Sequence, residues 1–321
     1  MFHYEKAVQP TIYFIGVTTA KSSIMKVFPA WANALKLKNT VIKGIDFAPH
    51  SPAEEYRRAV EFIKNDPLSL GALVTTHKID LYNSCKDLFD YIDPYARQLG
   101  EVSSISKKDG QYRAHAKDPI SSGLALENFV PENYWSDYGG DVLLLGAGGS
   151  SLAMSIYLGQ EKFGGNIPEK IIIANRSRPR LESAKKLLAS GNPHIRFEFI
   201  HNPTPADNDA TLASLKPHSL IVNATGLGKD APGSPLTDAC SFPRDSLVWE
   251  INYRGDLLFK VQAEKQASEK NLHVEDGWIY FIHGWTQVIA EVFHIEITGK
   301  LLDELSEIAK KVTVHGLTDR E

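Results

Sequence analysis

The chain has 321 residues, of which 43% are hydrophobic and 23% are charged, and its formal net charge is −4. This length exceeds a single typical core and predicts two domains of ordinary globular composition. The slightly negative charge offers no electrostatic basis for binding nucleic acid, and no apolar run approaches the roughly 20 residues of a membrane helix. Cys85 and Cys240 are too few for a disulfide framework or a cysteine-rich metal site. The N-terminus lacks the basic and apolar regions of a signal peptide, so we expect a cytoplasmic protein. We also expect a monomer or homodimer without nucleic-acid or membrane partners.

The first 130 residues alternate predicted strands and helices. Residues 11–16 form a buried strand that ends in glycine, and residues 71–75 form another short strand. Between them, residues 51–54 have the pattern of a helix start: a serine cap, a proline at the first helical position and a glutamate placed to close a capping box. Apolar residues then follow helical spacing until Asn65-Asp66-Pro67 ends it.

A polar, turn-rich stretch over residues 131–140 is the expected domain boundary. Beyond it the alternation restarts, with strands at 142–145, 170–174, 196–200 and 220–222, and helical patterns at 278–293 and 301–312 close the chain. Such alternation is typical of a doubly wound parallel sheet. We expect an α/β protein of two domains: residues 1–135, completed by C-terminal helices within 278–321, and a Rossmann domain over 136–277.

A glycine turn follows the strand at 142–145. It consists of Gly146, Ala147, Gly148, Gly149 and Ser150, after which small residues open a helical pattern. Gly146 permits a tight turn, Gly148 leaves no side chain in the way, and the following helix N-terminus favours an anion, as a pyrophosphate requires. The turn predicts a dinucleotide site; a purely structural glycine turn is the alternative.

The next predicted strand ends in a basic tip with the sequence Asn175-Arg176-Ser177-Arg178-Pro179-Arg180. In a Rossmann unit this tip lies beside the adenosine ribose, where an acidic residue would select NAD. Three arginines and no acid suit a 2′-phosphate instead. We therefore expect NADP as the cofactor, with a solvated basic turn as the alternative.

A third motif, Asn223-Ala224-Thr225 followed by glycines at 226 and 228, ends the strand at 220–222, at the edge where open α/β sheets bind ligands. In this order, behind an N-terminal α/β segment, the three motifs resemble the shikimate dehydrogenase family. That family has a G-A-G-G turn, an N-R-T/S clamp with a second arginine five positions after the asparagine, and an N-A-T-x-x-G loop near the nicotinamide. The resemblance covers nearly the whole chain and implies that Arg176 and Arg180 grip the 2′-phosphate of NADP.

The resemblance also implies a catalytic pair. Lys78 matches the family lysine that follows a short strand, and Asp118 matches an aspartate some 40 residues later. Oxidation of a secondary alcohol requires loss of a proton as hydride leaves, so a lysine within reach of the hydroxyl can hold that proton and a carboxylate can orient it.

Departures from the family pattern cluster among the residues that resemblance assigns to the substrate. Ser22 matches the first of two serines, but Ile24 replaces the second. Thr75 keeps a threonine only after a one-residue shift, and Ser103 replaces an asparagine. Each lost partner would have bound a hydroxyl or carboxylate, and each unmatched buried polar group costs about 1–3 kcal/mol. Lys117 and His77 are candidates for a new contact to an anionic group of the substrate. The alternative for Lys117 is a solvated surface side chain.

Further resemblances lie near the C-terminus. Tyr253 matches a tyrosine that faces the site, Gly277 begins the helix that carries a substrate glutamine, and Gln287 is the candidate glutamine, three positions later than the family spacing. His283 lies on the same helical face as Gln287. The aromatic residues of this segment, Trp278, Tyr280, Phe281 and Trp285, are expected to pack. No motif indicates a metal or a covalent nucleophile.

The resemblance implies an NADP-dependent dehydrogenase acting on a small hydroxylated carboxylic acid of the shikimate type, an enzyme of aromatic amino acid biosynthesis. Lys78 would exchange the hydroxyl proton, Asp118 would orient the lysine and the substrate, and Ser22 would bind the carboxylate. Quinate or another hydroxy acid is the alternative substrate. A non-catalytic NADP-binding sensor or regulator on the same fold is the alternative class.

Overall fold

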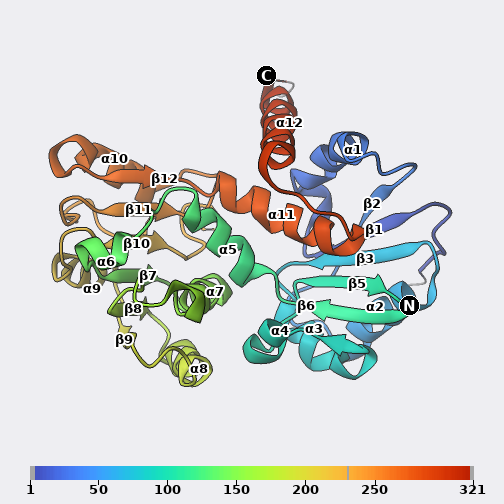
Figure 1. Cartoon of the computed structure of the whole chain (residues 1–321), viewed down its shortest axis with the longest axis horizontal. Helices are drawn as coiled ribbons and strands as arrows, with labels where there is room; N and C mark the ends of the chain where they lie inside the picture. The colour runs from blue at the N-terminus through green and yellow to red at the C-terminus, as the bar shows by residue number, and fades with distance from the viewer. Residues whose placement is uncertain (1–3, 230, 319–321) are drawn as a thin grey trace. The chain divides into compact units, whose positions relative to one another are not determined.

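A computed structural model describes residues 4–229 and 231–318, which divide into two compact units (Figure 1). The first unit comprises the chain up to Lys117 together with the part from Gly284 onward, and the second spans Asp118–His283. Helix α11 (Trp278–Phe293) contributes to both. None of the helices in the described part of the chain is long and apolar enough to span a membrane.

The first unit is built on a mixed sheet of strand order β2-β1-β3-β5-β6-β4. Its strands are β1 (Thr11–Gly16), β2 (Val41–Asp46), β3 (Ser69–Val74), β4 (Tyr91–Ile92), β5 (Ser104–Lys108) and β6 (Gln111–His115). Its helices are α1 (Ile24–Ala34), α2 (Ala53–Asn65), α3 (Lys78–Cys85), α4 (Pro94–Leu99) and α12 (Gly299–Thr318), with 3-10 turns η1 (Thr19–Lys21) and η2 (Lys86–Leu88). β2, β1 and β3 run parallel, whereas β5 is antiparallel to both β3 and β6.

Local sequence accounts for these elements. Strand β1 is buried along its whole length, as an apolar run at the centre of a sheet requires. β5 and β6 form a hairpin through Asp109 and Gly110, whose positive φ angles of 51° and 77° suit a two-residue turn. The expected cap of α2 is wrong: Pro52 is the N-cap, without a capping hydrogen bond, and the Ser51 hydroxyl donates to the carbonyl of Ala48.

Two aromatic side chains tie the C-terminal helices to the rest of the first unit. Trp285 of α11 packs edge-on against Phe14 of β1, with ring centroids 4.9 Å apart, which confirms its expected packing role. The indole N–H of Trp31 on α1 donates to the carbonyl of Leu305 on α12 at 2.7 Å. The chain from Gly284 onward groups with the N-terminal residues in the first compact unit.

The second unit has a wholly parallel sheet of strand order β12-β11-β10-β7-β8-β9. Its strands are β7 (Val142–Leu145), β8 (Lys170–Asn175), β9 (Arg196–His201), β10 (Leu220–Asn223), β11 (Leu247–Glu250) and β12 (His273–Glu275). Its further elements are α5 (Asp118–Glu127), α6 (Tyr134–Tyr138), α7 (Gly149–Leu158), η3 (Glu161–Phe163), α8 (Arg178–Leu188), α9 (Pro205–Ala213) and α10 (Leu258–Lys270). This strand order is that of a Rossmann sheet and confirms the predicted doubly wound domain.

Helices cover both faces of this sheet. Leu212 of α9 and Phe259 of α10 join one core cluster with Leu143 and Ile221 from the central strands. Among the remaining helices, α5 and α7 lie side by side (Figure 1). Gly123 of α5 makes this approach possible, because a Cβ there would lie 2.0 Å from the ring of Tyr157 on α7.

The packing of α5 explains where the units divide. The expected limits were 135/136 and 277/278, in turn-rich sequence, whereas the contacts divide the chain after Lys117 and after His283. α5 goes with the second unit because it packs on α7. The turn-rich stretch before Gly140 itself contains α6, whose Tyr134 and Trp135 are buried.

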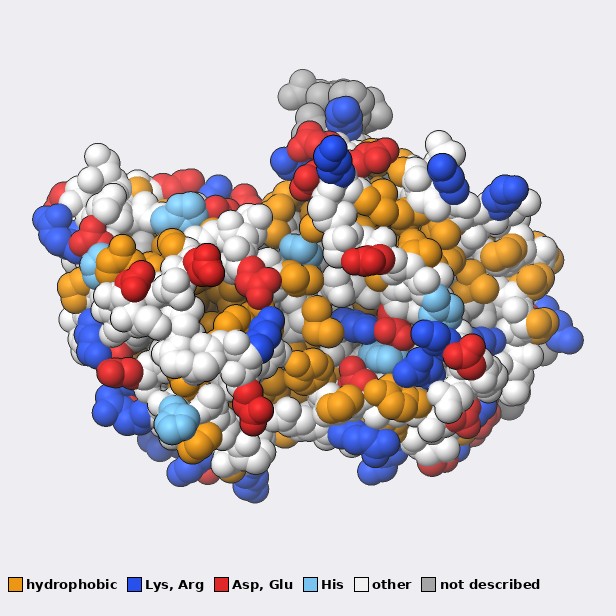
Figure 2. All heavy atoms as spheres, viewed as in Figure 1, with side chains coloured by type: hydrophobic (Ala, Val, Ile, Leu, Met, Phe, Trp, Pro, Cys, Tyr) orange, Lys and Arg blue, Asp and Glu red, His pale blue; other side chains and the backbone are white. Residues whose placement is uncertain are grey.

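Surface charge follows the composition. Figure 2 shows Lys and Arg side chains interspersed with Asp and Glu over the visible face, rather than a broad patch of one sign.

Candidate functional site

The glycine turn joins β7 to α7 at the point where the strand order of the second sheet reverses. β7 pairs with β8 on one side and with β10 on the other, so the connections leave in opposite directions and open a crevice at the strand ends. Gly146 has a φ of 115°, and a Cβ there would lie 2.7 Å from the carbonyl oxygen of Ala224. Only glycine lets the turn rest on the loop after β10.

The N-terminus of α7 faces this crevice without a side-chain cap. Gly148 is the N-cap and makes no capping hydrogen bond, and a Cβ added to it would meet open space. The first backbone N–H groups of a helix have no partner within the helix and carry a partial positive charge. An anionic group of a ligand can take them up.

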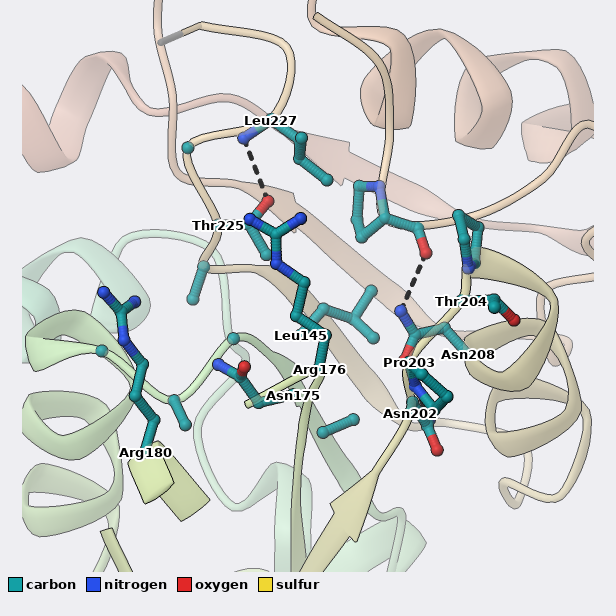
Figure 3. A pocket seen from close by; sticks show the side chains of 18 of the residues that line it. Leu145, Asn175, Arg176, Arg180, Asn202, Pro203, Thr204, Asn208, Thr225 and Leu227 are labelled. Atoms are coloured by element: carbon teal, nitrogen blue, oxygen red, sulfur yellow. Dashed lines mark hydrogen bonds between the residues drawn. The ribbon is translucent and has the colours of Figure 1, made fainter. Parts of the chain in front are cut away.

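A cavity of about 370 Å³ lies at these strand ends, within the size range of small-molecule sites (Figure 3). All three motifs contribute to it. Of the residues predicted to bind the cofactor, its lining includes Gly146, Ala147, Gly148, Asn175, Arg176, Arg180, Ala224 and Thr225. Gly149, Ser150, Ser177, Asn223 and Gly277 are not part of the lining. Asn202, Thr204 and Asn208, which no sequence motif indicated, also line it.

The basic tip after β8 presents two arginines to the cavity. The Asn175 carboxamide oxygen accepts the backbone N–H of Ser177 at 2.8 Å and so fixes the turn. Figure 3 shows Arg176 and Arg180 extending from this connection in the same direction. Both are exposed, and within residues 4–229 and 231–318 neither guanidinium has an ion-pair partner. Two uncompensated cations at the mouth of a cavity favour a doubly charged anion.

Asn223 is buried, and its hydrogen bonds fix the loop after β10. Its amide donates to Glu250 at 2.6 Å, and its carboxamide oxygen accepts the hydroxyl of Thr225 at 2.6 Å and the N–H of Thr225 at 3.1 Å. Asn252 donates to Glu250 through its backbone and side chain, at 2.9 and 2.6 Å, and to the carbonyl of Thr225 at 3.2 Å. The network holds Thr225 at the cavity.

Glu250 is the buried centre of that network. It has no solvent exposure, and burial raises its pKa to about 7, although the donors from Asn252 and Asn223 oppose the rise. No local sequence pattern indicates its contact with Asn223, which lies 27 positions earlier in the chain.

Gly277 has a packing role in the same unit. A Cβ there would lie 2.0 Å from the carbonyl oxygen of Ile251. Nearby, the half-buried ring of Tyr253 stacks at a tilt on Phe281, with centroids 4.6 Å apart, and lies 6.1 Å from the ring of Trp278. Tyr280 packs on Trp249, and its hydroxyl donates to Ser150 at 3.4 Å.

In the first unit, strand direction brings several predicted residues to one sheet edge. β1 and β3 are parallel, so Gly16, the last residue of β1, and Thr75, the residue after β3, lie at the same edge. A Cβ on Gly16 would lie 3.2 Å from the methyl group of Thr75. β5 is antiparallel to β3 and to β6, so Ser103 and the segment after His115 reach the same edge.

Lys78 begins α3 just beyond that edge. The turn before it is strained, since Thr76 has a φ of 60°, a left-handed conformation that a β-branched residue rarely adopts. The carbonyl of Lys78 accepts the N–H of Val102 at 3.0 Å, which ties the start of α3 to the segment before β5.

His77 is not the anion contact that its sequence position suggested. It is 1% exposed, its Nε2 lies 3.2 Å from the carbonyl oxygen of Gly16, and its Nδ1 lies 3.0 Å from the hydroxyl of Tyr56. Burial lowers its pKa, so the ring is held neutral inside the unit.

Lys117 is neither solvated nor available to an anion, because it pairs with Glu291 of α11. The ammonium lies 2.6 Å from one carboxylate oxygen of Glu291, with the side chains 12% and 17% exposed. The other oxygen accepts the hydroxyl of Ser106 at 3.2 Å and lies 3.0 Å from Nε2 of His115. Although burial acts the other way, His115 and Lys117 hold the pKa of Glu291 well below its usual range.

The pair lies beside two predicted substrate residues. The Ser103 hydroxyl accepts the backbone N–H of Lys117 at 2.7 Å, and Gln287 lies one helical turn before Glu291 on α11. Ser22, at the end of η1, is half-buried. Sequence reasoning missed Glu291, and its spacing from Gln287 was the available signal.

The structure assigns the predicted catalytic residues to different units. Lys78 belongs to the first unit, whereas Asp118 is the first residue of α5 in the second. Their pairing stays a prediction. Across the described residues, no group of three or more His, Cys, Asp and Glu side chains is placed to hold a metal ion.

Comparisons with known proteins point in one direction. No family model matches the chain. A shikimate dehydrogenase (NADP(+)) from Symbiobacterium thermophilum is 27% identical over 234 residues, which cover 72% of this chain and 73% of that protein. The structure of shikimate dehydrogenase from Aquifex aeolicus matches with a TM-score of 0.68 at 21% identity, over 97% of this chain and 99% of that one. Quinate dehydrogenase from Corynebacterium glutamicum, in complex with NAD, matches with a TM-score of 0.70 at 20% identity, over 94% and 99%. These matches confirm the expected fold.

The glycine turn gives a matched pair of substitutions. Gly146→Ala should lower the free energy of unfolding by about 1–3 kcal/mol, because it forces a side chain into positive φ and against the Ala224 carbonyl. Gly148→Ala should cost about 1 kcal/mol or less, the difference between glycine and alanine at an N-cap. Urea unfolding of both variants measures this difference, and equal losses would contradict the geometry.

Glu250 predicts a pH dependence of stability. Its pKa in the folded chain, about 7, lies above the ordinary 4.5, so the folded state binds the proton more tightly and the unfolding free energy should fall as pH rises through this interval. Glu250→Gln should flatten that fall between about pH 5 and about pH 8, as measured by urea unfolding. Glu182→Gln, an exposed site on α8, is the control. A wild-type slope in Glu250→Gln would mean that Glu250 does not titrate there.

Proposed function

Since this chain is a relative of the shikimate dehydrogenases, we propose that it is an NADP-dependent oxidoreductase that transfers a hydride between NADP(H) and a secondary alcohol or ketone of a small hydroxylated carboxylic acid. The relatives' names support the enzyme class and the cofactor. The substrate and the roles of individual residues are proposals drawn from the residues of this chain.

The observation that carries the proposal is the cavity at the ends of β7, β8 and β10. It combines a turn whose Gly148 leaves open space, an uncapped helix N-terminus and two arginines that have no ion-pair partner among the described residues. These residues fit a dinucleotide that bears a 2′-phosphate. The turn and α7 would hold the pyrophosphate, and Arg176 with Arg180 would hold the 2′-phosphate.

The chemistry divides between the cofactor and the chain. When bound, the nicotinamide supplies or accepts the hydride. In the oxidation direction, Nζ of Lys78 takes the proton from the substrate hydroxyl as its carbon loses hydride; in reduction, the same atom returns a proton to the ketone oxygen. Asp118 orients the lysine and the substrate.

Hydroxyl groups at one edge of the first sheet support a polyhydroxylated substrate. Thr75 and Ser103 lie at that edge, Ser22 follows β1 and η1, and Tyr253 and Gln287 are the further candidates. The Lys117–Glu291 pair is a charged neighbour of Ser103. We therefore propose that the substrate is a hydroxy acid of the shikimate or quinate type. The side chains that bind it would differ from those of the family pattern.

The NADP assignment is tested by arginine substitutions. Arg176→Ala should weaken NADP binding about tenfold and leave NAD binding within about twofold, since a hydrogen bond to a charged group contributes about 1.5–3 kcal/mol and this side chain is exposed. Arg178→Ala, on the same tip but not lining the cavity, is the control. Fluorescence titration with both dinucleotides measures the ratio of NADP affinity to NAD affinity. An unchanged ratio in Arg176→Ala would contradict the assignment of Arg176 to the 2′-phosphate.

The catalytic assignment is tested by Lys78→Met. Loss of a general acid-base should lower kcat with shikimate or quinate about 10²- to 10⁴-fold while NADP affinity stays unchanged. Activity close to that of the wild type would exclude Lys78 as the proton carrier. Tight NADPH binding with no turnover across a panel of hydroxy acids would favour the sensor over the enzyme.

A further inference from the structure

A second cavity, of about 440 Å³, lies in the second unit and shares no lining residue with the first. The last residues of α5 and α7 form part of its wall, including Leu126 and Tyr157. Trp135 of α6 and Phe163 of η3 also line it. The first residues of α5 and α7 are Asp118 and Gly149, so this cavity lies at the other end of both helices from the residues used in the proposed function.

The wall of this cavity is apolar and aromatic. The side chains of Leu126, Trp135, Tyr157 and Leu158 are all buried. The rings of Tyr157 and Phe163 meet edge-on with centroids 5.3 Å apart. These surfaces suit the apolar body of a small ligand.

The wall is also fixed in place. The carboxamide oxygen of Asn166 accepts three hydrogen bonds at the start of α6, from the N–H of Trp135, the N–H of Ser136 and the hydroxyl of Ser136, at 3.1, 3.1 and 3.3 Å. This joins α6 to the segment after η3. A ligand therefore meets a preformed site, which lowers the entropy cost of binding.

The rim carries charges of both signs. The ammonium of Lys162 lies 4.6 Å from the ring centroid of Tyr157 and 4.7 Å from that of Phe163, which are cation–π positions. It donates to the Tyr157 hydroxyl at 3.0 Å and lies 3.4 Å from Glu127, to which that hydroxyl donates. Lys162 and Glu127 are about half exposed, so their ion pair is weak and easily separated. Glu132 adds a second carboxylate to the lining.

We propose that this cavity binds an α-amino acid with a large apolar side chain. Glu127 takes the ammonium of the ligand, Lys162 takes its carboxylate, and the side chain packs on Trp135, Tyr157 and Phe163. A zwitterion fits because an acid and a base adjoin one aromatic wall, and separating their weak ion pair gives each a new partner. This inference does not rest on the proposed function.

The test is isothermal titration calorimetry of the whole chain in the presence of saturating NADP. Four probes are used: L-phenylalanine, L-leucine, phenethylamine, which lacks the carboxylate, and 3-phenylpropionate, which lacks the ammonium. L-Phenylalanine should bind with a dissociation constant of about 1 mM or tighter, and each single-charge analogue about tenfold more weakly. Binding that NADP abolishes would assign the probe to the first cavity and overturn the proposal.

Two variants separate the two charges. Glu127→Gln should weaken L-phenylalanine and phenethylamine about tenfold and leave 3-phenylpropionate unchanged. Lys162→Met should weaken the binding of L-phenylalanine and 3-phenylpropionate about tenfold and leave the binding of phenethylamine unchanged. Glu182→Gln is the matched surface control, and unchanged melting temperatures establish that the variants fold. No binding of L-phenylalanine, or binding indifferent to both variants, would overturn the proposal.

Discussion

The candidate cofactor cavity depends on the close approach of Gly146 to the carbonyl of Ala224. This contact brings the turn after β7 against the loop after β10, and the cavity lies where the two meet. The loop is in turn held from behind by Glu250, a buried carboxylate with donors from Asn223 and Asn252. A buried donor that loses its acceptor costs about 1–3 kcal/mol, so the loop has one well-defined arrangement.

Cationic side chains have opposite roles in the two units. Arg176 and Arg180 are exposed, and within the described residues they lack an ion-pair partner, which leaves their charge for a ligand. Lys117 is mostly buried beside Glu291, and its charge is balanced there by the carboxylate. The same residue type near a ligand site therefore indicates affinity for an anion in one case and internal structure in the other, and burial with a partner decides between them.

The sequence predicted the centre of the second unit well because β7, β8 and β10 are largely buried and appear as short apolar runs between turns. The strand at residues 142–145 and the helix at 278–293 were predicted with the bounds that the structure has. The hairpin of β5 and β6 was missed, although Asp109-Gly110 is a turn signal, because its strands alternate polar and apolar residues weakly.

The candidate site was predictable where backbone geometry fixes residue type, as at Gly146. The roles of Lys78 and Asp118 come from family resemblance and stay predictions. Contacts between distant segments were not predictable. The pairing of Lys117 with Glu291 joins residues 174 positions apart, and no local pattern encodes it. His77 appeared polar and available in sequence, but its contacts with Tyr56 and Gly16 depend on how α2 packs beside α3.

The placement of the arginine pair has an evolutionary consequence. Arg176 lies on a turn that Asn175 fixes, and Arg180 lies in the first turn of α8. Because both side chains are exposed, replacing them should change the free energy of folding by only about 0.5 kcal/mol. The residues that shape the loop, Asn223 and Glu250, are buried and have no such freedom. The proposed 2′-phosphate contacts are therefore separable from fold stability, so mutation can change one without endangering the other.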